Sequence, residues 1–422
     1  MPANMTGLVP RHLEGVIADR LTEEAVVVLN GARSVGKSTL LRRCAAARNV
    51  RILDLDDVRT REAVEADPTY FIEGQPEPVC IDEFQHVLTI LDAIKARLNR
   101  EMHPGMYLLT GSTRYTTLPA TSQSLTGRAH IVDVWPLSQG ELRGRKETFL
   151  STLVSDPAQL ITPTPSTTTR VEYERIVLTG GFPIALTRTT ESARRRWFRD
   201  FVTMVVSRDV LDIRKVRQRD VLPDILRHLV SQTGQLLNVT SVSNNVSLDR
   251  TTVGDFISLL ESVFLIHRLY AYGRTLSARV NRSPKVHVVD SGLGAALLGI
   301  TEAKLAERDM AALTEFGHLL ETFAVNEVLK QATWCDTPLT FSHLRTKDGE
   351  EVDLIGETDD GHIVGIEIKA ASGVQGDDFK GLRFLREKLG DAFVGGIVLH
   401  LGERSYKRED RLYVAPLDIL WT

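Results

Sequence analysis

The sequence predicts an α/β protein that begins with a parallel sheet covered by helices and ends with a second, smaller α/β unit. Two observations indicate this. Over the first 140 residues, short apolar runs that end in small or acidic residues alternate with helical stretches, a pattern typical of parallel sheets. After residue 345, two β-prone runs bounded by Asp-Gly turns predict a hairpin, and a helical region lies between the two units.

Composition limits the classes of protein to consider. The chain has 422 residues, too many for one ordinary core, with 42% hydrophobic and 25% charged residues, as in globular proteins. A net charge of −4 means that any nucleic-acid surface has to be local. Cys44, Cys80 and Cys335 lack metal-ligand spacing. Neither a signal-peptide pattern nor an apolar run of membrane-spanning length occurs, which predicts a cytoplasmic protein with no membrane segment.

The first functional motif is the octapeptide from Gly31 to Ser38, Gly-Ala-Arg-Ser-Val-Gly-Lys-Ser. An apolar run precedes it and a helix start follows it, which is the context of a phosphate-binding loop. Backbone N–H groups and the helix dipole would face the phosphates, while Lys37 reaches the β- and γ-phosphates and Ser38 ligates Mg²⁺. The alternative is a chance glycine turn. The expected nucleotide-binding residues are Gly31, Ala32, Arg33, Ser34, Val35, Gly36, Lys37, Ser38 and Thr39.

Further polar residues end the later strands, which are expected at 51–56, 78–83, 106–112 and 129–134. Ligands of parallel sheets bind at the carboxyl ends of the strands. We therefore expect Asp82 to hold Mg²⁺ and Glu83 to orient the attacking water. The alternative for Asp82 and Glu83 is an ordinary strand end that carries charge. Ser112 is a candidate sensor of the γ-phosphate, and its alternative is a plain polar turn.

Two arginines are candidates for stabilising transition-state charge. Arg128, in the sequence Leu-Thr-Gly-Arg, could act on the nucleotide of a neighbouring subunit, and Arg33 within the loop has a similar potential. An ordinary surface arginine is the alternative at both positions.

These motifs together resemble a family of prokaryotic AAA-type ATPases. The matching stretches are the phosphate-binding loop, Ile-Asp-Glu-Phe-Gln, Leu-Thr-Gly-Ser, Leu-Thr-Gly-Arg and Trp-Pro-Leu-Ser-Gln-Gly-Glu. The resemblance implies that the nucleotide is ATP and that Lys37, Ser38, Asp82 and Glu83 form its site. It also implies a C-terminal nuclease-like domain and makes a homo-oligomer a reasonable expectation. Serine at position 38 replaces the more usual threonine, with equivalent chemistry.

The middle of the chain predicts helices and a candidate DNA-binding unit. A Pro/Ser/Thr-rich stretch at 161–169 predicts a linker, and Gly180-Gly-Phe-Pro183 predicts a tight turn. Arginines at 194–199 and 208–219 could contact a nucleic-acid backbone, or form a solvated helix face with ion pairs. Three helices and a hairpin over 220–300 follow the winged-helix order, which serves either DNA binding or protein docking.

The C-terminal unit carries a second group of charged residues. Glu321 falls on a helix, Asp353 on a strand, and Glu367 and Lys369 on one face of the next strand. Carboxylates in this arrangement can hold one or two divalent ions, and a lysine can help to activate water. The pattern resembles PD-(D/E)xK nucleases, which implies Glu321, Asp353 and Glu367 as metal ligands, and Asp353, Glu367 and Lys369 as catalytic residues. The alternative is a charged, solvated hairpin.

Two functional hypotheses follow, on a predicted division into 1–140 (AAA-type ATPase), 141–219 (helical linker or lid), 220–300 (winged-helix-like) and 301–422 (nuclease-like). The first is an Mg²⁺-dependent ATPase coupled to a DNA-binding half with a nuclease-like domain that holds a second divalent metal. The second is a slow nucleotide-regulated binding switch whose C-terminal domain is a non-catalytic docking or dimerisation scaffold.

Overall fold

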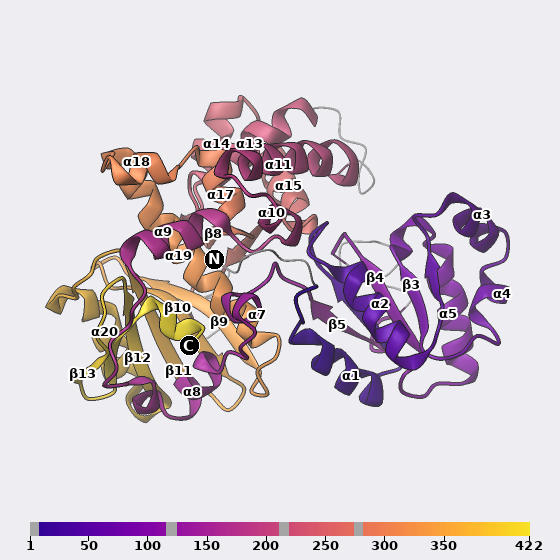
Figure 1. The fold of residues 1–422 in the computed structure, drawn as a ribbon, viewed down its shortest axis with the longest axis horizontal. Helices are drawn as coiled ribbons and strands as arrows, with labels where there is room; N and C mark the ends of the chain where they lie inside the picture. Colours follow the sequence, from indigo (N-terminus) through magenta and orange to yellow (C-terminus); the bar gives the residue numbers. More distant parts are fainter. Residues whose placement is uncertain (1–7, 115–124, 211–218, 274–281) are drawn as a thin grey trace.

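The computed structural model describes residues 8–114, 125–210, 219–273 and 282–422, and arranges them as two lobes (Figure 1). The N-terminal lobe is formed by the described residues up to 134, and the C-terminal lobe by those from 135 onward. Within the described residues, no helix has the length and apolar character that crossing a bilayer requires.

The N-terminal lobe is built on a parallel five-stranded sheet with the order β2-β3-β4-β1-β5. Alternate residues of the central strand face opposite sides, so Val27 and Leu29 pack with one layer of helices while Val26 and Val28 pack with the other. All five strands lie where the sequence predicts them. The strands are β1 (Val26–Asn30), β2 (Ile52–Asp54), β3 (Val79–Asp82), β4 (Tyr107–Gly111) and β5 (Ala129–Asp133).

Helices cover both faces of this sheet, as expected. One layer contains α1 (Leu13–Glu23) and α2 (Lys37–Arg48); the other contains α3 (Val58–Ala66), α4 (Pro68–Ile72) and α5 (Thr89–Arg100). The carboxyl ends of β1, β3 and β4 therefore meet at one edge, where the candidate nucleotide site lies.

The connecting region runs along the C-terminal lobe. The predicted linker at 161–169 is held there, because Ser166 Oγ and Thr168 Oγ1 each donate to Asp418 Oδ2 at 2.6 Å, and the Ser166 N–H donates to the Glu403 carbonyl at 2.7 Å. This stretch thus acts as a strap on the second sheet. The elements are α7 (Gln139–Arg143), α8 (Phe149–Ser155), η3 (Pro157–Leu160), α9 (Arg170–Thr179), α10 (Pro183–Leu186), α11 (Glu191–Met204) and η4 (Val205–Asp209).

The middle unit contains three helices followed by a hairpin, at the positions that the sequence predicts. Its small sheet has the order β6-β8-β7 and is antiparallel. The elements are η5 (Arg219–Val221), α13 (Leu222–Val230), β6 (Gln235–Leu236), α14 (Val239–Val246), α15 (Arg250–Ser262), β7 (Ile266–Leu269), β8 (Lys285–Val288), α17 (Ser291–Leu298) and α18 (Glu302–Ala306).

The last unit is a six-stranded mixed sheet with the order β13-β14-β12-β11-β10-β9. Strands β9 to β11 form an antiparallel meander, and the crossover through α20 places β12 parallel to β11. The long helix α19 contacts β10 and β11. The elements are α19 (Met310–Ala332), β9 (Leu339–Arg345), β10 (Glu351–Thr358), β11 (Ile363–Lys369), η6 (Gly376–Phe379), α20 (Lys380–Leu389), η7 (Gly390–Ala392), β12 (Phe393–His400), β13 (Tyr406–Glu409), β14 (Leu412–Pro416) and η8 (Leu417–Leu420).

The middle unit and the C-terminal sheet are packed together along α19. The Tyr272 N–H donates to the His343 carbonyl at 2.6 Å, which continues the edge of β7 onto β9. Buried side chains add contacts: the Thr233 and Thr322 hydroxyls lie 2.8 Å apart, and His267 Nε2 lies 2.8 Å from Asn326 Oδ1. This polar seam is buried and hydrogen-bonded, as a permanent interface requires.

Candidate functional site

The phosphate-binding loop joins β1 to α2 by a tight turn. Gly36 has φ of +105° and Ser34 has φ of +65°, so both residues adopt left-handed conformations, and at Gly36 this favours glycine. A Cβ at Gly31 would lie 2.3 Å from the carbonyl oxygen of Val134, so the loop starts in close contact with the residue that follows β5. The two glycines are therefore required by the turn and by packing.

Lys37 and Ser38 lie at the start of α2, directed toward the carboxyl edge of the sheet. The Lys37 side chain is buried, with 3% exposed, and its Nζ donates to the Gly31 and Ala32 carbonyls at 2.9 Å each. Ser38 Oγ donates to Asp82 Oδ1 at 3.2 Å, and the Thr110 hydroxyl donates to the same oxygen. A hydroxyl and a carboxylate from separate elements thus meet as Mg²⁺ ligation requires.

Glu83 follows directly, held in a left-handed conformation with φ of +53°. Its carboxylate accepts from Gln85 Nε2, which also lies 3.1 Å from Ser112 Oγ. Burial raises the pKa of Glu83, but the Lys37 charge and the Gln85 hydrogen bond outweigh it, so that the net shift is downward. Glu83 is therefore ionised at neutral pH, as a group that orients water should be.

The neighbouring Asp82 is shifted in the opposite direction. Burial raises its pKa more than the hydrogen bonds from Thr110 and Ser38 lower it. A carboxylate whose charge lacks full compensation is well suited to a cation. Thr110 is a contact that the sequence analysis did not predict; its position at the end of β4, beside the predicted Ser112, was the available signal.

The two candidate arginines differ in position. Arg33 lies in the loop, and its charge contributes to lowering the pKa of Glu83. Arg128 precedes Ala129, which pairs with Val26 at the amino end of β1, and its Nη1 donates to Asn99 Oδ1 at 2.7 Å. Arg128 thus lies at the sheet edge opposite the loop, and its role on the nucleotide of a neighbouring subunit stays a prediction.

Arg11 joins the phosphate-binding loop to the start of the second lobe. Its guanidinium donates to the Val35 carbonyl at 2.9 Å, the Trp135 carbonyl at 2.7 Å and Glu141 Oε1 at 2.9 Å. Glu141 also completes the capping box of α7 with Ser138. The Trp-Pro-Leu-Ser-Gln-Gly-Glu motif therefore fixes the loop to α7, a role that the sequence analysis did not assign.

The end of β4 contacts the middle unit. The Arg114 N–H donates to the Ser262 carbonyl at 2.9 Å, and Arg114 Nε donates to the Glu261 carbonyl at 3.0 Å. Arg114 stands two residues after the candidate sensor Ser112. A short path thus links the candidate nucleotide site to the end of α15.

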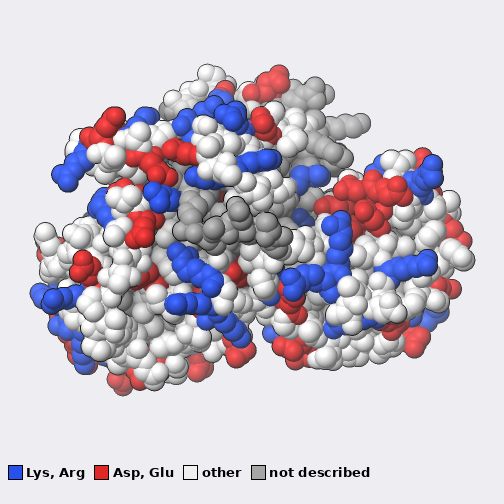
Figure 2. Space-filling view, viewed as in Figure 1, with Lys and Arg blue, Asp and Glu red and all other residues white. Residues whose placement is uncertain are grey.

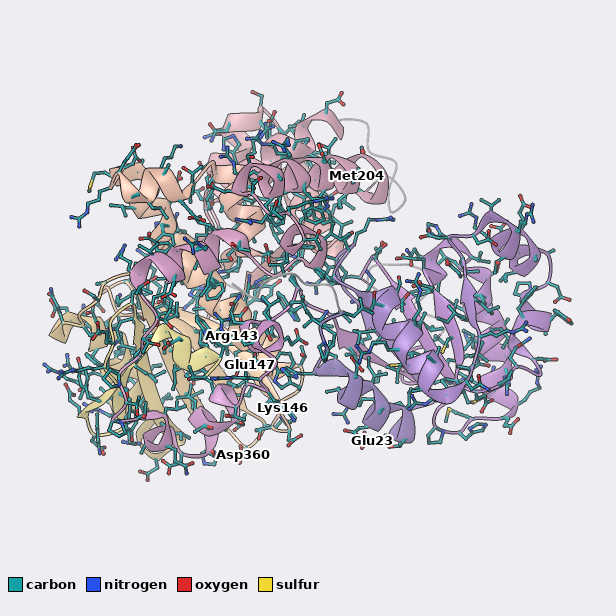
Figure 3. The ribbon with its side chains drawn as sticks, in the orientation of Figure 1. Glu23, Arg143, Lys146, Glu147, Met204 and Asp360 are labelled. Atoms are coloured by element: carbon teal, nitrogen blue, oxygen red, sulfur yellow. The ribbon has the colours of Figure 1, made fainter. Side chains whose placement is uncertain are left out.

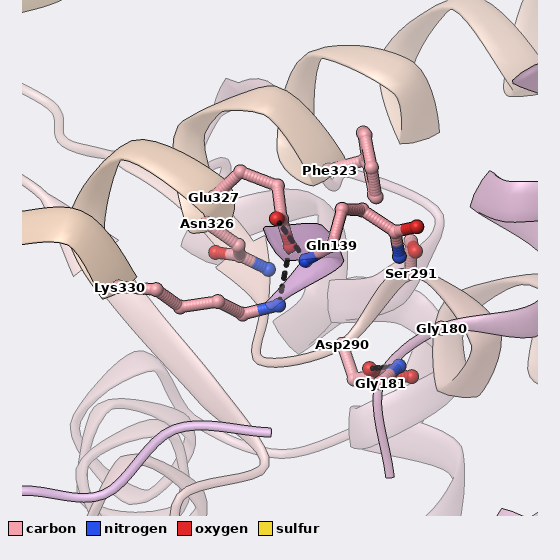
Figure 4. A pocket seen from close by; sticks show the side chains of 9 residues that line it. All are labelled: Gln139, Gly180, Gly181, Asp290, Ser291, Phe323, Asn326, Glu327 and Lys330. Carbon is pink, nitrogen blue, oxygen red and sulfur yellow. Dashed lines mark hydrogen bonds and ion pairs between the residues drawn. The ribbon is translucent and has the colours of Figure 1, made fainter. Parts of the chain in front are cut away.

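A close-packed junction explains the Gly-Gly-Phe-Pro motif (Figure 4). A Cβ at Gly180 would lie 2.2 Å from Asp290 Oδ1, and the Gly181 N–H donates to Asp290 Oδ2 at 2.7 Å. Beside it, Lys330 Nζ donates to Glu327 Oε1 at 2.6 Å and to the Leu137 carbonyl at 3.1 Å. The segment is a bend between α9 and α10, and its two glycines are required by close contacts at this junction.

The basic cluster is only partly available to a ligand. Arg194 is buried and its Nη1 donates to the Arg188 carbonyl at 3.2 Å, whereas Arg196 and Arg199 are exposed. Most of the predicted cluster at 208–219 lies outside the described residues. On the face shown in Figure 2, basic and acidic side chains are interspersed over both lobes.

The C-terminal fold brings the predicted acidic residues together. The register of β10 and β11 pairs Leu354 with Ile366, so the adjacent residues Asp353 and Glu367 lie opposite each other. Asp353 Oδ2 accepts from the Ile368 N–H at 2.9 Å, and Lys369 Nζ donates to Glu367 Oε1 at 2.8 Å. All of these groups are buried or half-buried, which is inconsistent with the alternative of a solvated charged face.

Lys285 of β8 reaches into this cluster from the middle unit. Its Nζ lies 2.7 Å from Glu321 Oε1, 2.9 Å from Asp353 Oδ1 and 3.0 Å from Glu351 Oε1. Burial lowers the pKa of Lys285, but these carboxylates raise it well above its usual value, so that the ammonium is charged. The sequence analysis did not predict Lys285; the available signal was a lysine in a short β-prone run.

The cluster does not fit the expected second metal. Across the described ranges, no group of three or more His, Cys, Asp or Glu side chains is arranged to hold an ion. The predicted ligands Glu321 and Asp353 contact an ammonium, and the predicted ligand Glu367 contacts Lys369.

Family models match three segments of the chain. Residues 23–143, which include most of the N-terminal lobe, match a model described as an AAA domain. Residues 170–304 and 316–420 match two models described as domains of unknown function, DUF8612 and DUF4143. The nuclease-like and DNA-binding assignments are not shown by these matches.

Relatives with similar sequences are themselves uncharacterized. Proteins of Mycobacterium tuberculosis and Mycobacterium bovis are each 24% identical over 398 residues, which is 94% of this chain and 81% of theirs. A Haemophilus influenzae protein is 23% identical over 306 residues, covering 67% of this chain and 72% of its own length.

Among solved structures, the Walker-type ATPase paby2304 of Pyrococcus abyssi aligns with a TM-score of 0.43 and 14% identity, over 69% of this chain and 96% of that one. The AMPPCP-bound DnaA from Aquifex aeolicus aligns with a TM-score of 0.28 and 13% identity, over 61% and 89%. The Thermotoga maritima RuvB Holliday junction branch migration motor aligns with a TM-score of 0.29 and 14% identity, over 63% and 92%.

Proposed function

We propose that this chain binds ATP with Mg²⁺ and hydrolyses it at the site formed by the phosphate-binding loop, Asp82 and Glu83. The observation that carries the proposal is the contact between Ser38 and Asp82, at 3.2 Å, beside the buried ammonium of Lys37. The match to an AAA domain over 23–143 supports it independently.

The side chains have distinct tasks in this proposal. Lys37 exchanges its contacts with the Gly31 and Ala32 carbonyls for phosphate oxygens, which carry more charge. Ser38 and Asp82 hold Mg²⁺, whose charge neutralises the phosphates. Glu83, positioned by Gln85, orients the attacking water, and Ser112 lies beside the same amide, where it can respond to the γ-phosphate.

The test is ATP turnover by the full chain with and without the loop lysine. We expect Lys37→Ala to lower turnover by about 100-fold, because preorganised charge at the phosphates is lost. Arg42→Ala is the matched control, since Arg42 is exposed on the same helix. Equal turnover in Lys37→Ala and the parent would overturn the site assignment.

We further propose that the nucleotide state is passed to the C-terminal lobe, as in the hypothesis of a nucleotide-regulated switch. The contacts of Arg114 with the Ser262 and Glu261 carbonyls support this path. Hydrogen exchange over residues 250–262 should change when a non-hydrolysable ATP analogue is added. The change should be absent in Lys37→Ala and reduced in Arg114→Ala; an unchanged exchange pattern in the parent would argue against the path.

We also propose DNA as a partner of the connecting region and the middle unit, and the test is binding of labelled DNA over a series of salt concentrations. Arg196→Ala with Arg199→Ala should weaken binding and reduce its salt dependence, because phosphate contacts release counterions. A salt-independent interaction, or none, would favour the protein-docking alternative.

A further inference from the structure

The acidic cluster of the C-terminal unit is filled by a cation from the chain itself. Lys285 stands on β8, outside the segment that contributes the carboxylates, and its side chain is 0% exposed. Three carboxylates from two elements surround its Nζ within 3.0 Å: Glu321 from α19, and Glu351 and Asp353 from β10.

The three carboxylates are compensated only while the Lys285 ammonium is present. Removing an ammonium from a buried group of carboxylates leaves their charges uncompensated, which is strongly unfavourable. The sequence pattern by itself predicted a divalent metal for two of these carboxylates, Glu321 and Asp353. The geometry therefore offers one place for a cation, and a lysine occupies it.

We propose that Lys285 is a built-in replacement for the divalent cation of this cluster, so that the C-terminal unit is a metal-free scaffold fastened to the middle unit. The ammonium satisfies Glu321, Glu351 and Asp353, and prevents a metal ion from approaching them. This inference concerns the C-terminal lobe and does not depend on ATP hydrolysis.

The position of Lys285 is fixed by the surrounding fold. Strand β8 pairs with β7 on one side and β6 on the other, and the edge of β7 continues onto β9 through the contact between Tyr272 and His343. The Thr233 and Thr322 hydroxyls, 2.8 Å apart, lie in the same seam. Withdrawing Lys285 would require parting this interface, so the lysine is a permanent occupant.

A second observation concerns Glu367, the remaining acidic residue of the cluster. Glu367 is buried beside Asp353, and its Oε1 accepts from Lys369 at 2.8 Å, while its Oε2 has no hydrogen-bond partner. A buried carboxylate oxygen without a partner is unusual in a folded protein. Once Lys285 is replaced by an uncharged residue, Glu367 and Asp353 should bind a small divalent ion.

The experiment is Mn²⁺ binding followed by electron paramagnetic resonance, in full-length protein carrying Asp82→Asn to remove the metal ligand of the nucleotide site. With Lys285 intact we expect no binding that depends on Asp353. Adding Lys285→Met should tighten Mn²⁺ binding at least about tenfold, and adding Asp353→Asn should abolish that gain. Mn²⁺ bound in the presence of Lys285 and lost with Asp353→Asn would overturn the proposal.

Folding of the variant is measured in the same series. If Lys285→Met lowers the melting temperature, Mn²⁺ should restore part of it. Lys330→Met is the matched control, because Lys330 is also buried but faces the single carboxylate of Glu327, and Mn²⁺ should not restore it. A folded Lys285→Met that neither binds nor responds to Mn²⁺ would also overturn the proposal. If Lys285→Met does not fold even with Mn²⁺, the proposal is tested by Mn²⁺ binding to the protein with Lys285 intact. Binding that depends on Asp353 would overturn it, and no such binding would support it.

Discussion

The two charged sites of this protein both contain a buried lysine, but they hold it differently. Lys37 in the phosphate-binding loop donates to two main-chain carbonyls, whereas Lys285 in the acidic cluster faces three carboxylates. A carbonyl is a neutral acceptor that a phosphate oxygen can replace; a carboxylate is a full counter-ion. The first arrangement leaves the lysine able to change partners, and the second holds it in place.

The comparison shows that chemically similar residues can define a ligand site or a permanent part of the fold. In the N-terminal lobe, Asp82 has a raised pKa and lacks a full counter-charge. In the C-terminal lobe, the equivalent demand for positive charge is met internally. We therefore expect the loss of the lysine to destabilise the C-terminal lobe much more than the N-terminal lobe.

The largest effect is expected from Lys285→Met. It should lower the free energy of unfolding by about 3–5 kcal/mol, because breaking a buried ion pair from one side leaves uncompensated charge. Lys37→Met should change it by about 1 kcal/mol or less, since Lys37 donates to the neutral Gly31 and Ala32 carbonyls. Chemical denaturation followed by tryptophan fluorescence compares the two. Equal losses would remove the distinction between the sites.

ATP turnover gives a second comparison of the two sites, when one carboxylate in each lobe is replaced by an amide. Glu83→Gln should retain ATP binding and slow turnover by about 100-fold, because the water is no longer oriented by a charged group. Glu367→Gln should leave turnover within about twofold of the parent, since no catalytic step is assigned to it. A steady-state phosphate-release assay measures both. Slow turnover in Glu367→Gln would show that the C-terminal cluster takes part in the cycle.

A substitution at Arg11, which lies outside the phosphate-binding loop, should weaken the candidate nucleotide site. Arg11→Ala removes three hydrogen bonds of a charged group and should weaken the support of the phosphate-binding loop by about 2 kcal/mol. We therefore expect ATP with Mg²⁺ to raise the melting temperature of Arg11→Ala less than that of the parent. Arg20→Ala is the control, because Arg20 forms an exposed ion pair with Glu23 on the nearby helix α1. An unchanged thermal shift in Arg11→Ala would exclude it as a support of the loop.

The smallest effect concerns the junction of the two lobes, where Glu147 is labelled in Figure 3. Burial lowers the pKa of His12, but the hydrogen bond with Glu147 and the charges of Glu141 and Glu147 outweigh it and raise the pKa above 6.5. The pKa of Glu147 is lowered, although burial opposes this, because His12 and other donors contact it.

The sign of the pH dependence follows from these shifts. Protonated His12 contributes its full stability below about pH 6.5, and loses it as pH rises through the raised pKa. His12→Gln should therefore lower the melting temperature more at about pH 6 than at about pH 8.5, by an amount equivalent to less than about 1 kcal/mol. A larger loss at the higher pH would contradict the assignment.

The sequence predicted what local pattern determines. The strands of the first sheet, the phosphate-binding loop, and the pairing of Asp353 with the strand that carries Glu367 all depend on residues close together in the chain or on the regular alternation of a strand. Turn chemistry and apolar periodicity act over a few residues, so these features can be read without the tertiary fold.

The contacts that change the interpretation of the sites are long-range. Lys285 is 36 residues from Glu321 and 68 from Asp353, and Arg11 is 130 residues from Glu141. No periodic pattern links such positions, because their proximity results from the packing of separate units. The sequence therefore predicted the acidic residues correctly as neighbours, but not the lysine that occupies the space between them.

The position of Lys285 also constrains how the gene can change. The lysine falls in the segment 170–304, and its carboxylate partners in the segment 316–420, which match two separate family models. Recombination that gave either segment a new neighbour would leave a buried ammonium, or a set of buried carboxylates, without its counter-charge. The two segments should therefore be inherited in tandem, and a lineage that loses the lysine should also have replaced its acidic partners.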